Sequence, residues 1–103
     1  MENEFDGVRF RRRYDRVTGP FDGVLEGRVL VYDLNLGGCF VNSSEASPEG
    51  ATSILKINLL KEGWITVNAE TLYRLEHGFA VRFLAPDSDT EARIARTVAA
   101  LKR

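Results

Sequence analysis

Hydrophobic positions between residues 26 and 83 follow the two-residue period of β-strands. Residues 26–34 are rich in valine and leucine at both parities, which predicts a strand covered on both faces. A short strand is expected at 39–41, an alternating strand at 52–59 that only Ile54 interrupts, and another at 79–83. The longest alternating run predicts one buried face made of Ile65, Val67, Ala69, Thr71 and Tyr73. With polar or glycine-containing turns between them, these segments predict five or six strands in a small antiparallel barrel or sandwich.

The two ends of the chain follow other patterns. Residues 1–20 show no sustained period and end in Gly19-Pro20, which predicts an extended arm. Residues 87–102 place apolar side chains at helical spacing and predict one amphipathic helix, with Ser88 and Glu91 at the spacing of a capping box. The apolar stripe of this helix consists of Ile94, Val98 and Leu101. We therefore expect a single domain over 1–103, with a flexible basic arm (1–20), a barrel (21–85) and a helix (87–102).

Composition narrows the classes of function. A chain of 103 residues that is 44% hydrophobic and 28% charged is typical of one globular domain. A single cysteine and a single histidine exclude an internal disulfide and the usual zinc sites, so no metal or cofactor is expected. Catalytic pairs of carboxylates or of Ser/His or Cys/His do not emerge, which argues against an enzyme. No apolar run reaches the roughly 18 residues of a membrane span, and we expect a cytoplasmic protein.

Three residues that could carry chemistry have simpler expected roles. We expect Cys39 to be a small core residue, because no histidine is near it in sequence. His77 precedes a glycine in a turn and should be exposed. Trp64 should pack in the core or at a strand end.

Positive charge is concentrated in the arm. Five arginines and one aspartate give residues 9–16 a net charge of +4, which leaves −5 for the rest of the chain. Arginine offers a planar fork that binds phosphate bidentately and stacks on flat rings, whereas lysine does neither well. The cluster is thus either a binding site for a phosphorylated ligand or a solvated basic arm.

The order of motifs resembles the PilZ family of bacterial domains, from about Arg11 to the C-terminus. The resemblance rests on the runs RRRYDR, DLNLGG followed by CFV, GWITV and HGFAVRF, and on the final helix. It implies an all-β fold, a six-stranded antiparallel barrel with one C-terminal helix. Many members are receptors for cyclic di-GMP and use an R-x-x-x-R motif together with a [D/N]-x-S-x-x-G turn.

Carried over residue by residue, the resemblance gives a set of candidate ligand residues. The first motif matches Arg12 and Arg16, with Arg11 as the preceding basic residue; Arg9 and Arg13 offer a competing register. The second motif matches Asp33, Asn35 and Gly38, with Gly37 beside it, and Asn35 stands where the family has serine. The expected ligand site therefore consists of Arg11, Arg12, Arg16, Asp33, Asn35, Gly37 and Gly38.

These residue types suit the chemistry of a guanine dinucleotide. The arginine fork matches the O6 and N7 acceptors of guanine and can also cover a phosphate or a ring face. The Asp33 carboxylate suits the N1–H and N2–H donors, and the Asn35 amide can bind the same base or its phosphate. Gly37 and Gly38 would let the backbone turn sharply and approach the ligand without a Cβ.

The resemblance leads to one function and leaves two alternatives. It implies a cyclic di-GMP receptor whose arm folds over the ligand and signals to an effector protein, since the sequence predicts no output domain. The first alternative is a PilZ-like protein-interaction module that has lost nucleotide binding, which the Asn35 substitution keeps open. Nucleic acid is a less favoured partner, because the rest of the chain is acidic rather than uniformly basic.

Overall fold

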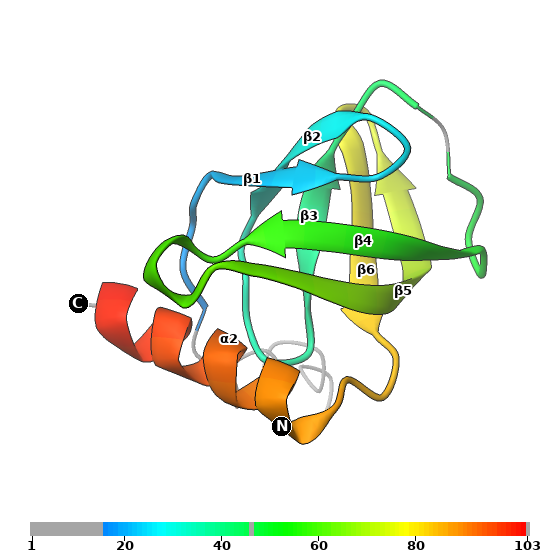
Figure 1. Cartoon of the computed structure of the whole chain (residues 1–103). Helices are drawn as coiled ribbons and strands as arrows, with labels where there is room; N and C mark the ends of the chain where they lie inside the picture. The colour runs from blue at the N-terminus through cyan, green and yellow to red at the C-terminus, as the bar shows by residue number, and fades with distance from the viewer. Residues whose placement is uncertain (1–15, 46, 103) are drawn as a thin grey trace, which may run out of the picture.

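The computed structural model describes residues 16–45 and 47–102, which form a closed six-stranded antiparallel barrel and one helix (Figure 1). In chain order the strands are β1 (Phe21–Val24), β2 (Arg28–Tyr32), β3 (Gly38–Asn42), β4 (Thr52–Asn58), β5 (Trp64–Leu75) and β6 (Gly78–Phe83). Around the barrel their order is β1-β2-β3-β6-β5-β4, and β4 pairs with β1 to close it. A short 3-10 helix, η1 (Leu60–Glu62), joins β4 to β5, and α2 (Ser88–Leu101) follows β6. The predicted fold class is confirmed.

Alternate side chains of the strands form the core together with residues outside the strands, among them Leu34, Leu59 and Ile94. The largest fully buried side chains include Phe21, Phe79, Leu34, Leu55, Ile57, Leu59 and Ile94. Burying one such side chain stabilises the fold by about 1.5–3 kcal/mol, so the barrel interior is the main source of stability. Phe79, Val81 and Phe83 are all buried, as their spacing predicts.

Three details of the strands differ from the sequence pattern. The strand β2 is covered on one face only, because Leu30 is 39% exposed, so the prediction of two covered faces is wrong. In β5 the buried face ends at Thr71, because a bulge between Thr71 and Tyr73 changes the register with β6 and leaves Tyr73 exposed. The strand β1 was not predicted as a separate element; it has only four residues, and one is a glycine.

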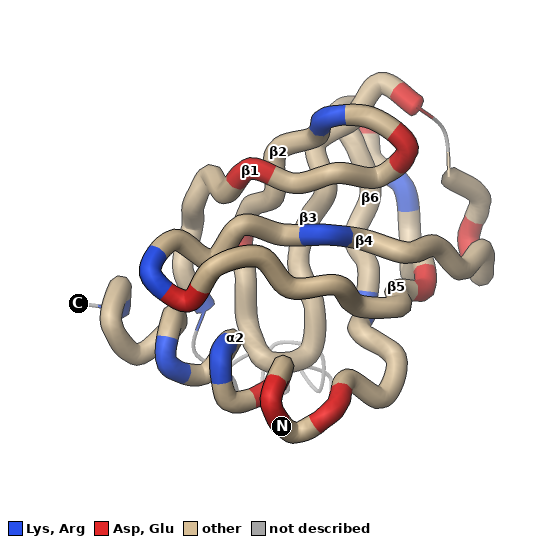
Figure 2. The backbone as a smooth tube through the Cα atoms, viewed as in Figure 1, with Lys and Arg blue, Asp and Glu red and all other residues tan. Residues whose placement is uncertain are grey.

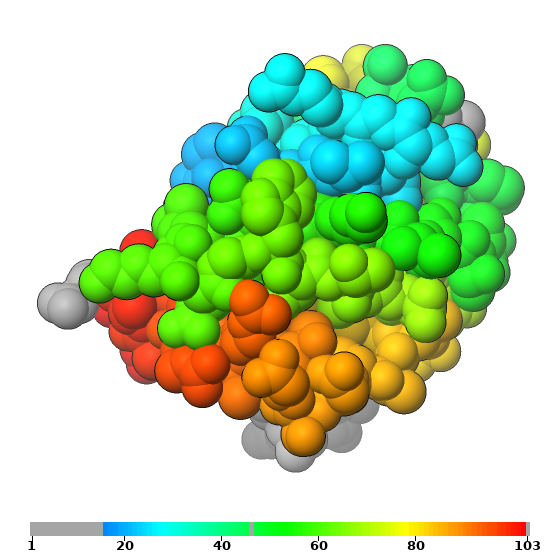
Figure 3. Space-filling model, viewed as in Figure 1, coloured from blue at the N-terminus to red at the C-terminus, as the bar shows by residue number. Residues whose placement is uncertain are grey.

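Helix α2 packs against η1 and β5 at one end of the barrel (Figures 1 and 3). Ile94 and Val98 are buried, whereas Leu101 is 44% exposed. The cap is Asp87 rather than the predicted Ser88: its Oδ1 accepts the Thr90 backbone N–H at 2.8 Å. No helix among the described residues has the length and apolar character needed to cross a membrane.

Two arginines of α2 bind η1 through Glu62. Arg93 donates to the Glu62 carbonyl oxygen, and Arg96 Nη2 lies 2.9 Å from Glu62 Oε1. This hydrogen bond from Arg96 lowers the pKa of the Glu62 carboxyl. In Figure 2, basic and acidic residues are interspersed over the barrel and the helix. Arg93 and Arg96 therefore connect α2 to η1, and the charge of Arg96 is paired with Glu62.

Candidate ligand-binding site

A tight turn between β2 and β3 is built around the side chain of Asn35. Its Oδ1 accepts two backbone N–H groups, from Gly37 at 2.6 Å and from Gly38 at 3.0 Å. The backbone closes the same turn, because Asn35 N–H donates to the Gly38 carbonyl at 2.9 Å. Two donors on one oxygen fix the orientation of the amide, so its Nδ2 group is the atom left to donate to another molecule. We call residues 33–38 the Asx turn.

Asp33 begins the Asx turn in a left-handed backbone conformation, with φ of 54°. Aspartate is among the few residues that adopt this conformation at modest cost. Asp33 is half-buried, and its N–H donates to the Thr18 carbonyl at 3.2 Å. Burial raises the pKa of the neighbouring Cys39 thiol, and the Asp33 charge adds to the shift. Asp33 thus places a carboxylate directly after β2, at the start of the Asx turn.

The end of the arginine-rich arm is attached to this turn. Val17 and Leu34 form an isolated antiparallel bridge with two backbone hydrogen bonds of 2.9 Å, and both side chains are buried. One step from this pair, the antiparallel register sets Arg16 opposite Asn35. Arg16 is exposed and forms no ion pair with a carboxylate of the described residues. The fold therefore brings one predicted arginine and the predicted turn together.

The described end of the arm, residues 16–20, precedes β1 and is joined to the Asx turn through Val17 and Thr18. Arg11 and Arg12, and the competing Arg9 and Arg13, lie outside the described residues. Their role in the ligand site stays a prediction.

The two glycines of the turn contact β6. The Gly37 carbonyl accepts the Phe83 N–H at 2.8 Å. Gly38 is buried, and a Cβ on it would lie 2.1 Å from the Val81 carbonyl oxygen, so no larger residue fits. The close approach that Gly38 permits in this structure is to the neighbouring strand, and this need alone explains the glycine.

A charged pair beside the turn was not predicted from the sequence. Arg82 of β6 is opposite Gly38 of β3 on one side and Glu70 of β5 on the other. Its Nε lies 2.6 Å from Glu70 Oε1. Alternation along residues 79–83 identifies Arg82 as outward-facing, but only the strand register reveals its two neighbours.

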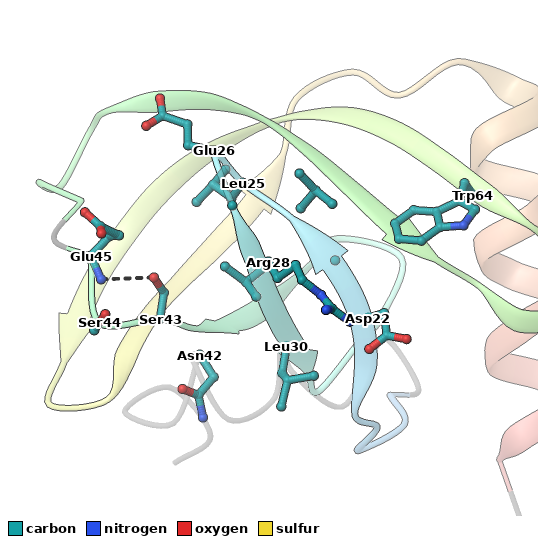
Figure 4. A pocket seen from close by; sticks show the side chains of 14 residues that line it. Asp22, Leu25, Glu26, Arg28, Leu30, Asn42, Ser43, Ser44, Glu45 and Trp64 are labelled. Atoms are coloured by element: carbon teal, nitrogen blue, oxygen red, sulfur yellow. Dashed lines mark hydrogen bonds between the residues drawn. The ribbon is translucent and has the colours of Figure 1, made fainter.

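A surface hollow outside the Asx turn is shown in Figure 4, and none of residues 33–38 lines it. It has a volume of about 720 Å³ and is bordered by the β1–β2 hairpin, residues 42–45 and Trp64. None of the predicted ligand residues that the structure describes lines it. A second hollow of about 630 Å³ lies between residues 16–21, Leu60 and the end of α2, and Arg16 lines it.

The remaining candidates occupy positions that the sequence largely predicts. Cys39 is buried and His77 is exposed, as expected. Trp64 is 49% exposed at the start of β5, so it lies at a strand end and not in the core. Within the described ranges, no group of three or more His, Cys, Asp and Glu residues could bind a metal ion.

Comparison with solved structures identifies the fold. No protein-family model matches the sequence, and no curated protein matches it. The PilZ domain of YcgR from Escherichia coli, solved with c-di-GMP, matches with a TM-score of 0.74 and 23% identity over 90% of this chain and 92% of that one. The longer structure of Escherichia coli YcgR in complex with c-di-GMP matches with a TM-score of 0.73 and 25% identity, again over 90% of this chain. This match covers 46% of that YcgR chain.

An uncharacterized protein from Legionella matches less closely, with a TM-score of 0.53 and 15% identity over 85% of this chain and 90% of that one. The chain thus has the PilZ fold, which confirms the fold that the sequence resemblance implied. Both Escherichia coli structures contain bound c-di-GMP.

Proposed function

We propose that this protein is a receptor for cyclic di-GMP that binds the dinucleotide at the Asx turn and the arm end next to it. The observation that carries the proposal is the bridge between Val17 and Leu34, because it sets the exposed Arg16 opposite Asn35. Two segments that the ligand hypothesis requires are thus adjacent although their bridged residues, Val17 and Leu34, are 17 positions apart in the sequence. The PilZ fold, seen with c-di-GMP in YcgR, supports the same ligand.

Each group at the turn has a distinct part in binding. Arg16 supplies a positive fork without a described carboxylate partner, which suits a phosphate. The Asp33 carboxylate accepts from the N1–H and N2–H edge of a guanine, and Asn35 Nδ2 donates to the base or a phosphate oxygen. Gly37 and Gly38 maintain the turn that presents these groups. Arg11 and Arg12 extend the positive charge along the arm.

Signalling follows from the position of the arm. Its attached end at residues 16–18 is hydrogen-bonded to the Asx turn, so a ligand that binds the turn also contacts the base of the arm. Folding of the more distal arginines onto the ligand changes the surface offered to other proteins. We therefore propose that binding is transmitted to an effector protein of the cytoplasm through the arm, in the control of motility or exopolysaccharide.

The direct test is calorimetric titration of the full chain with cyclic di-GMP. The variant Arg16→Ala should weaken binding at least tenfold, as expected for loss of one charge-assisted contact. Arg28→Ala is the matched control, because Arg28 is also exposed but lies at the opposite end of β2. Its affinity should equal that of the wild type. Absence of any saturable heat with the wild-type chain would overturn the receptor function and favour the protein-interaction module.

Trp64 provides an independent control within the same experiment. It is six residues before Glu70 on β5, roughly 20 Å along the strand, and it lines the hollow of Figure 4 rather than the Asx turn. Binding at the turn should therefore leave Trp64 fluorescence nearly unchanged. Strong quenching at saturation would instead place the ligand in that hollow.

A further inference from the structure

Arg82 lies directly across the sheet from the Asx turn. Gly38 and Arg82 are partners in register, and a Cβ on Gly38 would come within 3.0 Å of the Arg82 Cα. The next residue, Phe83, donates its N–H to the Gly37 carbonyl at 2.8 Å. Because Val81 and Phe83 are buried, Arg82 points to the outer surface of the barrel. Arg82 is therefore an outward-facing neighbour of the Asx turn, on the strand that lies between the turn and Glu70.

Glu70 holds this guanidinium by one edge only. The contact joins Arg82 Nε to Glu70 Oε1 at 2.6 Å, and the two residues are partners in register between β5 and β6. The Arg82 side chain is still 57% exposed. Within the described part of the chain, the Nη1 and Nη2 groups have no hydrogen-bond partner. The open edge is a planar fork of parallel N–H donors whose direction Glu70 restricts.

The charge of the pair distinguishes between two kinds of ligand group. Glu70 already balances the charge of Arg82, and its carboxylate would repel a phosphate placed beside it. A guanine edge presents two neutral acceptors, O6 and N7, at the spacing of the arginine fork. Arg16 differs, because no carboxylate of the described residues balances it. The two arginines therefore suit different parts of one ligand.

We propose that Arg82 reads the O6 and N7 edge of a guanine and is a specificity-determining residue of this site, with Glu70 as its positioning residue. The inference rests on the proposed function, since it requires a guanine dinucleotide at the Asx turn. It adds β5 and β6 to a site that the sequence motifs confine to the arm and the β2–β3 turn.

The test compares the affinity of cyclic di-GMP for the wild-type chain with Arg82→Ala, Arg82→Lys and Arg74→Ala. Both Arg82 variants should lose roughly 10- to 100-fold in affinity, because alanine has no donor and a lysine ammonium lacks the planar fork of arginine. Lysine retains the charge, so recovery of affinity in Arg82→Lys would show a phosphate contact and overturn the proposal. Arg74→Ala, an exposed arginine elsewhere on β5, should bind like the wild type.

Two Glu70 variants test the positioning role. Glu70→Gln keeps an oxygen acceptor for Arg82 Nε and should bind cyclic di-GMP with the wild-type affinity. Glu70→Ala should weaken binding several-fold, while its melting temperature stays near that of the wild type. Equal affinity in Glu70→Ala and Glu70→Gln would contradict this role. Unchanged binding in Arg82→Ala overturns the inference but leaves the receptor function intact. Failure of the wild-type chain to bind defeats both.

Discussion

Asn35 should contribute to stability and to ligand binding through different atoms of one amide. Its Oδ1 accepts the N–H groups of Gly37 and Gly38, and removal by Asn35→Ala leaves both donors without that partner. At about 1 kcal/mol net for each hydrogen bond, the free energy of unfolding should fall by about 2 kcal/mol. For a domain of this size, that loss corresponds to a decrease in the melting temperature of roughly 10 °C.

Asn35→Asp separates the two roles. The carboxylate keeps an oxygen for the two backbone donors, so urea and thermal denaturation should place this variant within about 0.5 kcal/mol of the wild type. It lacks the Nδ2 donor and adds a negative charge beside the site proposed for the ligand. Its affinity for cyclic di-GMP should therefore fall at least tenfold although the fold is intact.

Two results would refute the reasoning about Asn35. If Asn35→Ala unfolds at the wild-type temperature, the two hydrogen bonds do not stabilise the turn. If Asn35→Asp is as unstable as Asn35→Ala, the acceptor oxygen is not the atom that matters. A third variant, Asn35→Ser, should be intermediate in stability, since a hydroxyl reaches the same donors less well.

Two further predictions concern residues next to the turn. Gly38→Ala should unfold the protein or lower its melting temperature more than Asn35→Ala does, because the new Cβ would meet the Val81 carbonyl at 2.1 Å; wild-type thermal stability would contradict this. Burial, with the Asp33 charge adding, raises the pKa of Cys39, so the folded thiol stays protonated and should not react with a disulfide reagent until urea unfolds the chain. Its contribution to stability is complete below the ordinary thiol pKa and decreases as the pH rises above it, since only the unfolded thiol then ionises. Cys39→Val should therefore lose less stability than the wild type between pH 8 and pH 10; rapid labelling of the native protein or identical pH slopes would be contrary results.

The alternation of apolar residues predicts the barrel because each strand buries one face. The alternation correctly predicts that Phe79, Val81 and Phe83 are buried. It overstates the burial of residues 26–34, where Leu30 remains exposed. Alternation also fails beyond Thr71, since the bulge inserts a residue that depends on pairing with β6. A local pattern reports which side a residue faces and does not reveal where two strands lose register.

The sequence predicts the part of the site in which the contacts join residues that are close together in the chain. The hydrogen bonds of the Asx turn join Asn35 to Gly37 and Gly38, within four consecutive residues. The local sequence is therefore enough to predict this turn. The contacts of Arg82 with Glu70 and with the turn join positions 12 and 44 residues apart, which only the barrel order determines. The arginines before residue 16 remain known from sequence alone.

The location of the ligand is the central claim, and backbone amide NMR during titration with cyclic di-GMP tests it most directly. The account predicts saturable shift changes concentrated at residues 16–18, at the Asx turn and at Arg82, with small changes in the β1–β2 hairpin. Changes centred on that hairpin and Trp64 would place the ligand in the hollow of Figure 4 and contradict the site. A spectrum that does not change at millimolar ligand would contradict the receptor function itself.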